Sequence, residues 1–499
     1  MKRRLALNSV ISLLYQICAV VIGLIIPRIV LGAFGSEING MLNSMKQMLS
    51  IITLLDLGVG AVVQASLYKP LLEKNQDRIS EIYYSAKKYF TIIAWALIVY
   101  IVILCVYYGI YKTSEQFSWV FTTTLILSLS INYFAQYYFG ISNTLLLNAD
   151  QRIYVVTIVN LIGLVLNAVA TVVLIRLGSS VQMVQLASSM VFLLKPLALE
   201  IYVKNKYDIK KPNVISGDVL PEKWNGLIHH VATTITASVD TVILTLTSSF
   251  QLLSIYHVYV LPLNSIRNLF EVTSTSFKSF FGNIYASGDY EKLNNEFDSY
   301  ETFMHYAVTT VFSTVSVTLV PFVLVYTNVV SDVNYKDELF CVFITLAYAI
   351  YSLRVTYTNM IFAAGRFKET QQHSLVEVAL NIIVSIVLVF PLGLSGVAIG
   401  TAVSSCYRLI MSVKYLGVDV INRKGTVFAK KIIVDAACVT LVYIIARLFV
   451  VDIHSFSEWL IFAFGVFICS LLITTTLFSI LLKDSFDIKK IIQRIKSRG

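Results

Sequence analysis

Residues 1–31 read MKRRLALNSVISLLYQICAVVIGLIIPRIVL, a basic start followed by a long apolar run. The apolar core of a signal peptide has about 7–15 residues and precedes a small-residue cleavage site. The run from Leu5 to Leu31 is longer, and no such site follows it. We therefore expect this run to remain in the protein as a first membrane-spanning helix, which takes roughly 20 apolar residues.

The rest of the chain has the same character. Of the 499 residues, 57% are hydrophobic and 14% are charged, and the mean hydropathy is +0.75. A typical soluble domain has about 25% charged residues. This composition excludes a soluble enzyme, a disordered chain, a fibrous repeat and a large extramembrane domain. It predicts an all-α polytopic membrane protein.

Apolar stretches and the breaks between them predict fourteen spans. They cover residues 8–31, 41–66, 89–111, 117–147, 153–176, 181–203, 225–248, 252–283, 300–327, 338–363, 374–391, 393–416, 430–451 and 458–482. An even number of spans places both termini on the same side of the membrane.

Basic residues follow a pattern in the loops between these spans. One alternate set of loops holds most lysines and arginines, and the opposite set holds little beyond Lys112, Arg176, Lys336 and Arg447. Positive residues collect in cytoplasmic loops. We therefore attribute the net charge of +10 to membrane topology rather than to nucleic-acid binding, and expect both termini in the cytoplasm.

An internal repeat has an offset of 214 or 215 residues. The segment DRISEIY at 77–83 corresponds to EKLNNEF at 291–297, and the residue pairs Arg152 and Arg366, Leu177 and Leu392, and Asp56 and Glu271 correspond in the same way. The repeat predicts six-helix bundles over 1–214 and 215–425, and two additional helices with a basic cytoplasmic tail over 426–499. Duplicated halves around a central site are a common transporter plan.

No motif for catalysis or for metal binding is present. The sequence lacks HExxH, a P-loop, GxSxG and a glycine-rich dinucleotide fingerprint. Its six cysteines lie in apolar runs without CxxC spacing, which indicates small core residues rather than metal ligands or disulfides. We expect a protein that is not an enzyme and has no metal or cofactor. Gly393, Gly396 and Gly400 have the spacing of closely packed helices.

Charged residues inside the predicted spans are the candidate functional residues, because such charges are costly in lipid unless they meet a partner or water. On helix 252–283, Arg267, Glu271 and Lys278 share one face at about 100° per residue. That face also carries Tyr256 and Asn264.

Other spans contribute further charges. Lys46 belongs to a polar stripe on helix 41–66 with Asp56 at its flank, and Arg28, Asp240 and Arg354 lie in three other spans. Together they predict a central polar cavity with net positive charge. Structural roles are the alternative: Arg267 and Glu271 would form an ion pair, Asp240 would pair with an arginine, and the two lysines would extend to the membrane surfaces.

The chain also resembles a known family. Residues 26–90, IPRIVLGAFGSEINGMLNSMKQMLSIITLLDLGVGAVVQASLYKPLLEKNQDRISEIYYSAKKYF, resemble the polysaccharide transporter family. Its members are Wzx-type flippases of lipid-linked oligosaccharides within the MATE/MVF (MOP) exporter superfamily. Supporting segments are LLLNADQRIYV at 145–155, GRFKETQQHS at 365–374 and LGLSGVAIGTA at 392–402.

This resemblance implies two six-helix bundles around a cavity and transport by alternating access in the bacterial cytoplasmic membrane. The implied substrate is undecaprenyl diphosphate carrying a glycan repeat unit for surface polysaccharide. Membrane lipids, a polysaccharide polymerase and glycosyltransferases are the implied partners.

The predicted site residues fit such a substrate. The cationic residues would bind the diphosphate, Tyr256 and Asn264 would face the glycan, and the acidic residues would bind a coupling sodium ion or proton or form charge pairs. The cations are Arg28, Lys46, Arg267, Lys278 and Arg354, and the acids are Asp240, Asp56 and Glu271.

Three other functions stay open. A drug-exporting MATE antiporter is disfavoured because the first helix carries Arg28 and no acidic residue. A lipid II flippase would also need a cationic cavity. A membrane-embedded glycan polymerase or ligase would need a large outer loop, whereas the outer segments at 328–337 and 452–457 are short.

The charge pattern makes a topology prediction. A cysteine introduced at position 332 should react with an impermeant maleimide added outside intact cells, whereas cysteines at 75, 208 and 424 should react only after the membrane is opened. Labelling of position 208 in intact cells would contradict the predicted orientation.

Overall fold

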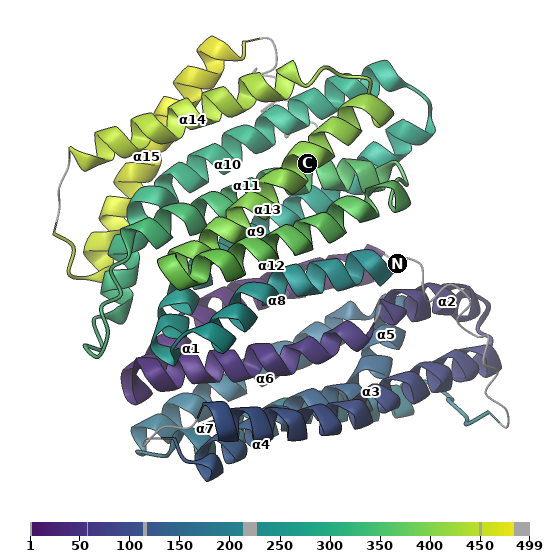
Figure 1. Ribbon diagram of the computed structural model, residues 1–499. Coiled ribbons are helices and arrows are strands. Elements are labelled where there is room, and N and C mark those ends of the chain that lie inside the picture. The colour runs from purple at the N-terminus through teal and green to yellow at the C-terminus, as the bar shows by residue number, and fades with distance from the viewer. Residues whose placement is uncertain (1, 57, 113–116, 213–226, 449–451, 484–499) are drawn as a thin grey trace. The chain divides into compact units, whose positions relative to one another are not determined.

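The computed structural model describes residues 2–56, 58–112, 117–212, 227–448 and 452–483, and these residues fold as helices joined by short turns (Figure 1). The first part of the chain forms α1 (Lys2–Ser50), η1 (Ile51–Asp56), α2 (Val59–Glu73), α3 (Gln76–Tyr111), α4 (Trp119–Ala135), η2 (Gln136–Gly140), α5 (Ile141–Ala149), α6 (Ile153–Arg176) and α7 (Val181–Lys206). The second part forms α8 (Leu227–Thr247), α9 (Phe250–Ala286), α10 (Tyr290–Thr327), α11 (Glu338–Ala363), η3 (Lys368–Thr370), α12 (Gln371–Leu392), α13 (Leu394–Tyr415), η4 (Leu416–Val420), α14 (Thr426–Arg447) and α15 (Phe456–Leu481).

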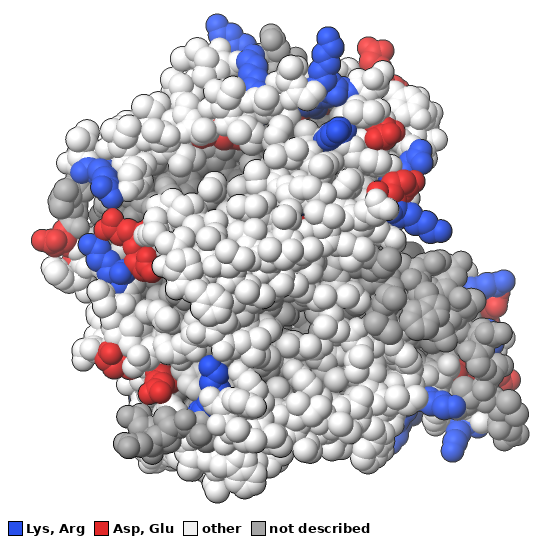
Figure 2. Space-filling model, viewed as in Figure 1, with Lys and Arg blue, Asp and Glu red and all other residues white. Residues whose placement is uncertain are grey.

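The predicted fold class is confirmed, and the predicted spans correspond to the helices. Most spans match one helix each, and those at 153–176 and 338–363 coincide with α6 and α11. Within the described ranges, nine helices are long and apolar enough to cross a membrane, and α8 contains a shorter apolar stretch. In each part of the chain, charged side chains in Figure 2 lie mostly near helix ends, and the surface between them is uncharged.

Two of the predicted spans are interrupted by irregular helix geometry. The first span and the start of the second lie in α1, which is broken at Gly35 (φ 81°, ψ 174°), and the second span continues through the 3₁₀ helix η1 into α2. A positive φ of this kind strains any residue with a Cβ atom. The span at 117–147 contains a π-helical turn, η2, between α4 and α5.

The chain divides into two compact units, residues 1–238 and 239–499. In the first unit, α1 packs on α6, α6 on α7, and α4 on α3 and α7. In the second unit, α13 packs between α11 and α12, and the pair α14 and α15 packs on α10. The division into 1–214, 215–425 and 426–499 stays a prediction, because residue 214 lies outside the described residues.

The backbone carries the internal repeat that the sequence predicts. The three pairs of residues with positive φ that match at an offset of 214 or 215 are Lys74 (56°) and Gly288 (74°), Gln151 (58°) and Gly365 (75°), and Gly178 (72°) and Gly393 (55°). Residues with positive φ thus mark equivalent turns in each half.

Helix caps repeat with the same spacing. Asn75 begins α3 by accepting a hydrogen bond from the backbone N–H of Arg78, and Asp289 begins α10 by accepting one from Lys292. These caps precede the repeated segments 77–83 and 291–297. Each cap satisfies an N–H group that would otherwise lack a partner at the helix start.

The predicted glycine packing is confirmed where α13 crosses α12. A Cβ atom on Gly396 would lie 2.1 Å from the carbonyl oxygen of Leu388, and one on Gly400 would lie 2.8 Å from the backbone nitrogen of Ser385. These distances are shorter than van der Waals contact, so the two helix backbones approach closely only because both residues lack side chains.

Gly396→Ala should therefore force α12 and α13 apart and destabilise the protein by about 1–3 kcal/mol, the usual cost of overpacking. Thermal unfolding of the purified protein in detergent measures this effect. Gly465→Ala on α15 is the matched control, since no atom lies within 4 Å of its added Cβ. Equal unfolding temperatures for the two variants would contradict the packing argument.

Candidate functional site

Arg267 on α9 is a cation without a carboxylate partner among the described residues. Its guanidinium lies 5.8 Å from the ring centre of Tyr348 and 5.1 Å from that of Tyr351, both on α11. Its Nε is buried and donates no hydrogen bond to any described residue. The ion pair with Glu271, the structural alternative in the sequence, does not form, so the positive charge of Arg267 is not neutralised by this neighbour.

Lys278, eleven residues further along α9, also lies against aromatic rings. Its ammonium lies 5.4 Å and 5.2 Å from the ring centres of Phe362 and Phe367. It is half-buried, and no acidic side chain in the described ranges lies within ion-pair distance. Aromatic rings stabilise a cation through their negative faces but do not cancel its charge.

Arg354 on α11 lies in a buried network instead. It forms an ion pair with Glu377 on α12, and its guanidinium lies 4.3 Å from the ring centre of Tyr351. Arg408 on α13 is 3.8 Å from the same carboxylate and donates to the Thr370 carbonyl at 2.8 Å. The role of Arg354 in substrate binding stays a prediction, and in this structure Arg354 shares the Glu377 carboxylate with Arg408.

Asp240 on α8 is the centre of a polar cluster in the second unit. It is 7% exposed, and its Oδ2 accepts hydrogen bonds from the hydroxyls of Tyr256 at 3.1 Å and Thr401 at 2.7 Å. Its Oδ1 is buried and accepts none from the described residues. The predicted pairing with an arginine is absent from the described residues, so hydroxyl groups are the partners of this carboxylate.

Oxygen atoms of α12 and α13 extend this cluster. Asn381 and Ser385 are both fully buried, and the Ser385 hydroxyl lies 2.9 Å from Asn381 Oδ1 and 3.4 Å from the Val397 carbonyl. The Thr401 hydroxyl also lies 3.2 Å from the Val397 carbonyl. Carboxylate, amide, carbonyl and hydroxyl oxygens are the ligands of hard cations. No group of three or more His, Cys, Asp or Glu residues suited to a metal occurs in the described ranges.

Tyr256 and Asn264, the predicted glycan contacts, are hydrogen-bonded within the protein. Tyr256 is buried and donates to Asp240, and Asn264 accepts a hydrogen bond from Tyr348 at 3.0 Å. Tyr348 also lies beside Arg267. These two residues therefore position Asp240 and the aromatic support of Arg267.

The predicted stripe on helix 41–66 is wrong, because that helix is not continuous. α1 ends at Ser50, η1 ends at Asp56, and Gly58 adopts φ 71° before α2 begins. Lys46 and Asp56 therefore belong to different segments. Lys46 is exposed, whereas Asp56 and Arg28 are half-buried in the first unit.

Three tyrosine hydroxyls bind backbone carbonyls around this break. Tyr133 donates to the Lys46 carbonyl at 3.1 Å, Tyr100 to that of Met48 at 2.9 Å, and Tyr89 to that of Leu55 at 2.7 Å. Carbonyls at the end of a helix have no partner within it. Side chains of α3 and α4 thus support an irregular backbone inside a predicted span.

A second charged cluster, between α10 and α14, was not predicted from the sequence. It contains Asp298, Glu301 and His305 on α10, and Arg423, Lys431 and Asp435 before or on α14. The signal was present, since Glu301, His305, Lys431 and Asp435 fall inside the predicted spans. The observed helix α14 begins at Thr426, four residues before the predicted span, so Lys431 lies in its second turn.

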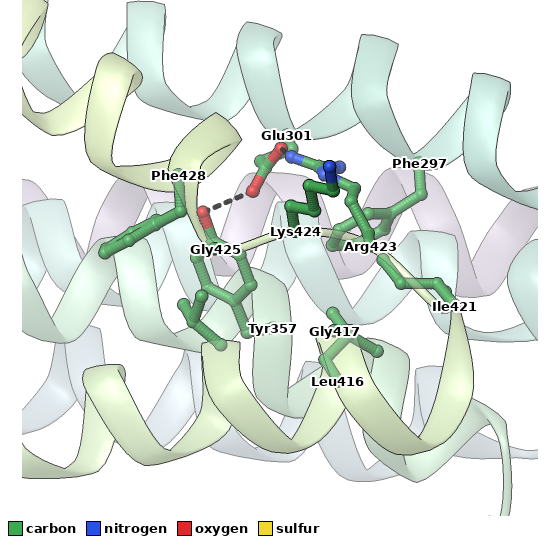
Figure 3. Close-up of a pocket in the computed structure, with 11 residues that line it drawn as sticks. Phe297, Glu301, Tyr357, Leu416, Gly417, Ile421, Arg423, Lys424, Gly425 and Phe428 are labelled. Carbon is green, nitrogen blue, oxygen red and sulfur yellow. Dashed lines mark hydrogen bonds and ion pairs between the residues drawn. The ribbon is translucent and has the colours of Figure 1, made fainter.

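A pocket opens beside this α10–α14 cluster (Figure 3). It has an empty volume of about 250 Å³ including its open mouth. Its charged lining residues are Glu301, Arg423 and Lys424, and its walls include Phe297, Tyr357 and Phe428. The pocket therefore combines an aromatic wall with charged groups.

Comparisons with known proteins give matches in fold only. No family model and no curated protein sequence matches the chain. The lipid II flippase MurJ in its inward closed conformation superposes with a TM-score of 0.70 at 15% identity, over 95% of this chain and 99% of that one. An inward-facing multidrug resistance MATE transporter of the MOP superfamily gives 0.57 at 12% identity, over 80% and 96%.

A further match is a MOP superfamily transporter from Pyrococcus furiosus, described as having a binding pocket of reverse polarity, with a TM-score of 0.55 at 12% identity over 84% and 95%. The chain therefore has the fold of MurJ and the MATE transporters. At these identities the similarity establishes the fold and leaves the substrate open.

The Asp240 cluster makes a binding prediction. If its oxygens bind a monovalent cation, sodium should raise the unfolding temperature of the purified protein in a concentration-dependent manner, and Asp240→Asn should abolish that rise. Asp435→Asn, which also alters a buried aspartate, should keep it. An undiminished sodium response in Asp240→Asn would exclude Asp240 as a ligand.

Proposed function

We propose that the protein is a flippase that moves undecaprenyl-diphosphate-linked oligosaccharide repeat units across the bacterial cytoplasmic membrane by alternating access. The product would enter surface polysaccharide assembly. The fold shared with MurJ over 95% of the chain supports a transporter of lipid-linked substrates, and the sequence resemblance to Wzx-type flippases supports the oligosaccharide.

The observation that carries the proposal is the surroundings of the Arg267 guanidinium. A buried or half-buried arginine in a membrane protein normally has an acidic partner, and Arg354 shows that arrangement in the same unit. The Arg267 guanidinium lies against the rings of Tyr348 and Tyr351 instead, and none of the described residues gives it a carboxylate. An arginine fixed in this way suits an anionic ligand, because its planar fork matches the oxygens of a phosphate group.

Lys278 extends the cationic character along α9. Eleven residues of helix rise about 16 Å, a length suited to a diphosphate with its first sugar. In the first unit, Lys46 is exposed and forms no ion pair among the described residues. These charges agree with a polyanionic head group and disfavour a cationic drug as the substrate.

A lipid II flippase is the second candidate, favoured by the similarity to MurJ. Both substrates carry a polyprenyl diphosphate and differ in the attached glycan, so Arg267 fits either. A MATE-like antiporter is disfavoured by the unneutralised cations. A glycan polymerase or ligase is less well supported, because the segment between α10 and α11 is short.

Ion coupling is assigned to the Asp240 cluster within this proposal. Asp240 and Thr401 belong to α8 and α13, so a bound sodium ion or proton would stabilise the conformation in which these helices meet. Glycosyltransferases and a polysaccharide polymerase would act beside the flippase. The glycosyltransferases would build the glycan head group, and the polymerase would consume it.

Reconstitution in proteoliposomes tests the function. Vesicles containing the protein should move undecaprenyl-diphosphate-linked oligosaccharide from the inner to the outer leaflet, measured by access of an added glycosidase. Lipid II as competitor separates the two candidates: strong inhibition favours the lipid II flippase, and weak inhibition favours the oligosaccharide flippase. Absence of translocation of both substrates would contradict the proposal.

Arg267→Ala should weaken binding of the diphosphate-linked substrate about ten- to a hundredfold, because a charged hydrogen bond contributes roughly 1.5–3 kcal/mol. Abundance in the membrane should stay normal, since no buried carboxylate loses its partner. Microscale thermophoresis with the purified lipid measures the affinity, and Arg447→Ala, which alters an exposed arginine, is the control.

The double change Arg267→Ala with Glu271→Ala distinguishes a ligand from a structural ion pair. A ligand role predicts that affinity stays low in the double variant. If abundance and affinity both recover in the double variant relative to Arg267→Ala, the two residues act as a structural pair, and Arg267 is not a ligand of the substrate.

A further inference from the structure

The α10–α14 cluster contains a chain of hydrogen bonds that does not involve the Asp240 site or Arg267. Four α10 residues, Asp298, Glu301, His305 and Thr309, are spaced by three or four positions and share one helix face. That face meets Lys431 and Asp435 of α14 and Tyr357 of α11. Figure 3 shows Glu301 and Tyr357 side by side at the pocket.

One end of the chain is fixed by charge. Glu301 and Lys431 are each 1% exposed in their side chains, and Lys431 Nζ lies 2.5 Å from Glu301 Oε2. Arg423 donates to the same oxygen. Two cations on one carboxylate oxygen keep Glu301 ionised, and an ionised carboxylate can only accept hydrogen bonds.

From Glu301 the chain continues to Asp435. The Tyr357 hydroxyl lies 2.6 Å from Glu301 Oε1, and His305 Nε2 lies 2.8 Å from that hydroxyl. His305 Nδ1 lies 2.5 Å from Asp435 Oδ2, and the Thr309 hydroxyl donates to Asp435 Oδ1 at 2.7 Å. The His305 side chain is fully buried, and these are the partners of its two nitrogens among the described residues.

The protons in this chain can be counted. Tyr357 has one hydroxyl proton and gives it to Glu301, so His305 Nε2 must carry a proton and donate it to the tyrosine oxygen. The contact between Nδ1 and Asp435 then requires another proton, either on the ring or on the carboxyl group. In both cases the His305–Asp435 pair holds one proton more than a neutral imidazole beside a carboxylate.

We propose that the His305–Asp435 pair is a proton-binding site whose occupancy controls the contact of Tyr357 with Glu301. When the proton leaves, Nε2 becomes an acceptor, and the single Tyr357 proton serves either Nε2 or Glu301, but not both. Release therefore breaks one hydrogen bond linking α10 and α11 beside the pocket. The inference does not depend on the proposed function.

The groups around the ring are consistent with an exchangeable proton. Helix α14 contributes Asp435, Lys431 and the thiol of Cys438. Helix α11 contributes Tyr357, helix α10 contributes Glu301 and Asp298, and Arg423 lies beyond them. The packing of α9 and α15 on α10 adds hydroxyl pairs, Tyr300 with Ser274 and Ser313 with Ser470. Asp298 and Glu301 pair with Lys431 and Arg423, and Lys424 lies at the adjoining pocket. Asp435 has His305 as its basic partner among the described residues.

The first half of the repeat lacks this site. At an offset of 214, His305 corresponds to Thr91 and Thr309 to Trp95, and Trp95 is 58% exposed. In the second half, α14 and α15 pack on α10, and the same helix face becomes an interior that holds polar groups. The site is therefore specific to the part of the chain that carries the additional helices.

Nitrogen-15 NMR of the histidine-labelled full-length protein in lipid nanodiscs tests the proposal. At about pH 8 an ordinary histidine is neutral. Wild-type protein should show one imidazolium signal that His305→Gln removes, or a neutral ring together with the infrared carbonyl band of a protonated carboxyl that Asp435→Asn removes. A neutral ring without that band would overturn the proposal.

Tyr357→Phe tests the link to the tyrosine. Without the hydroxyl, Nε2 has no acceptor, and a neutral ring satisfies Asp435 alone, so the signal of the additional proton should be lost. Tyr300→Phe removes another buried tyrosine hydroxyl on α10 and should leave the signal unchanged. A signal that persists in Tyr357→Phe would refute the coupling, and the wild-type measurement decides proton binding if either variant fails to fold.

Discussion

A backbone N–H or C=O group in the apolar part of a bilayer must find its hydrogen-bond partner within the protein, because lipid offers none. This constraint accounts for the helical form of the described chain and for the detail of its interruptions. Where η1 interrupts the second predicted span, hydroxyls of Tyr89, Tyr100 and Tyr133 bind nearby carbonyls. An irregular segment is stable there because neighbouring helices supply its partners.

The same constraint separates the buried charges into two kinds. Glu377 and Glu301 each bind two basic groups, so the charges of those clusters are held in ion pairs that join helices. Arg267 and Lys278 rest against aromatic rings and have no carboxylate partner in the described part of the chain. Asp240 is surrounded by hydroxyls. A transporter that couples a polyanionic substrate to a cation needs positive charge for the substrate and negative charge for the cation. Our proposal assigns the substrate to α9 and the cation to α8.

The internal repeat shows how one plan serves two purposes. Turns and caps recur at the same offset in both halves, because they fix the path of the chain. The polar side chains of the α10–α14 cluster do not recur: the face of α10 with Glu301 and His305 corresponds to a face of α3 with Lys87 and Thr91. The two additional helices cover that face only in the second half, and covering it changes which side chains it can hold.

The sequence alone determined the fold class, the approximate helix positions and the repeat, because apolar length, glycine placement and loop charge are local properties that depend on the solvent around the chain. It also identified Arg267, Lys278 and Asp240 as unusual charges in apolar surroundings. It did not determine their partners. The pairing of Arg354 with Glu377, the break after Ser50 and the chain from Asp435 to Glu301 each join side chains from different helices. Such contacts depend on how helices cross and rotate, which only the tertiary structure decides.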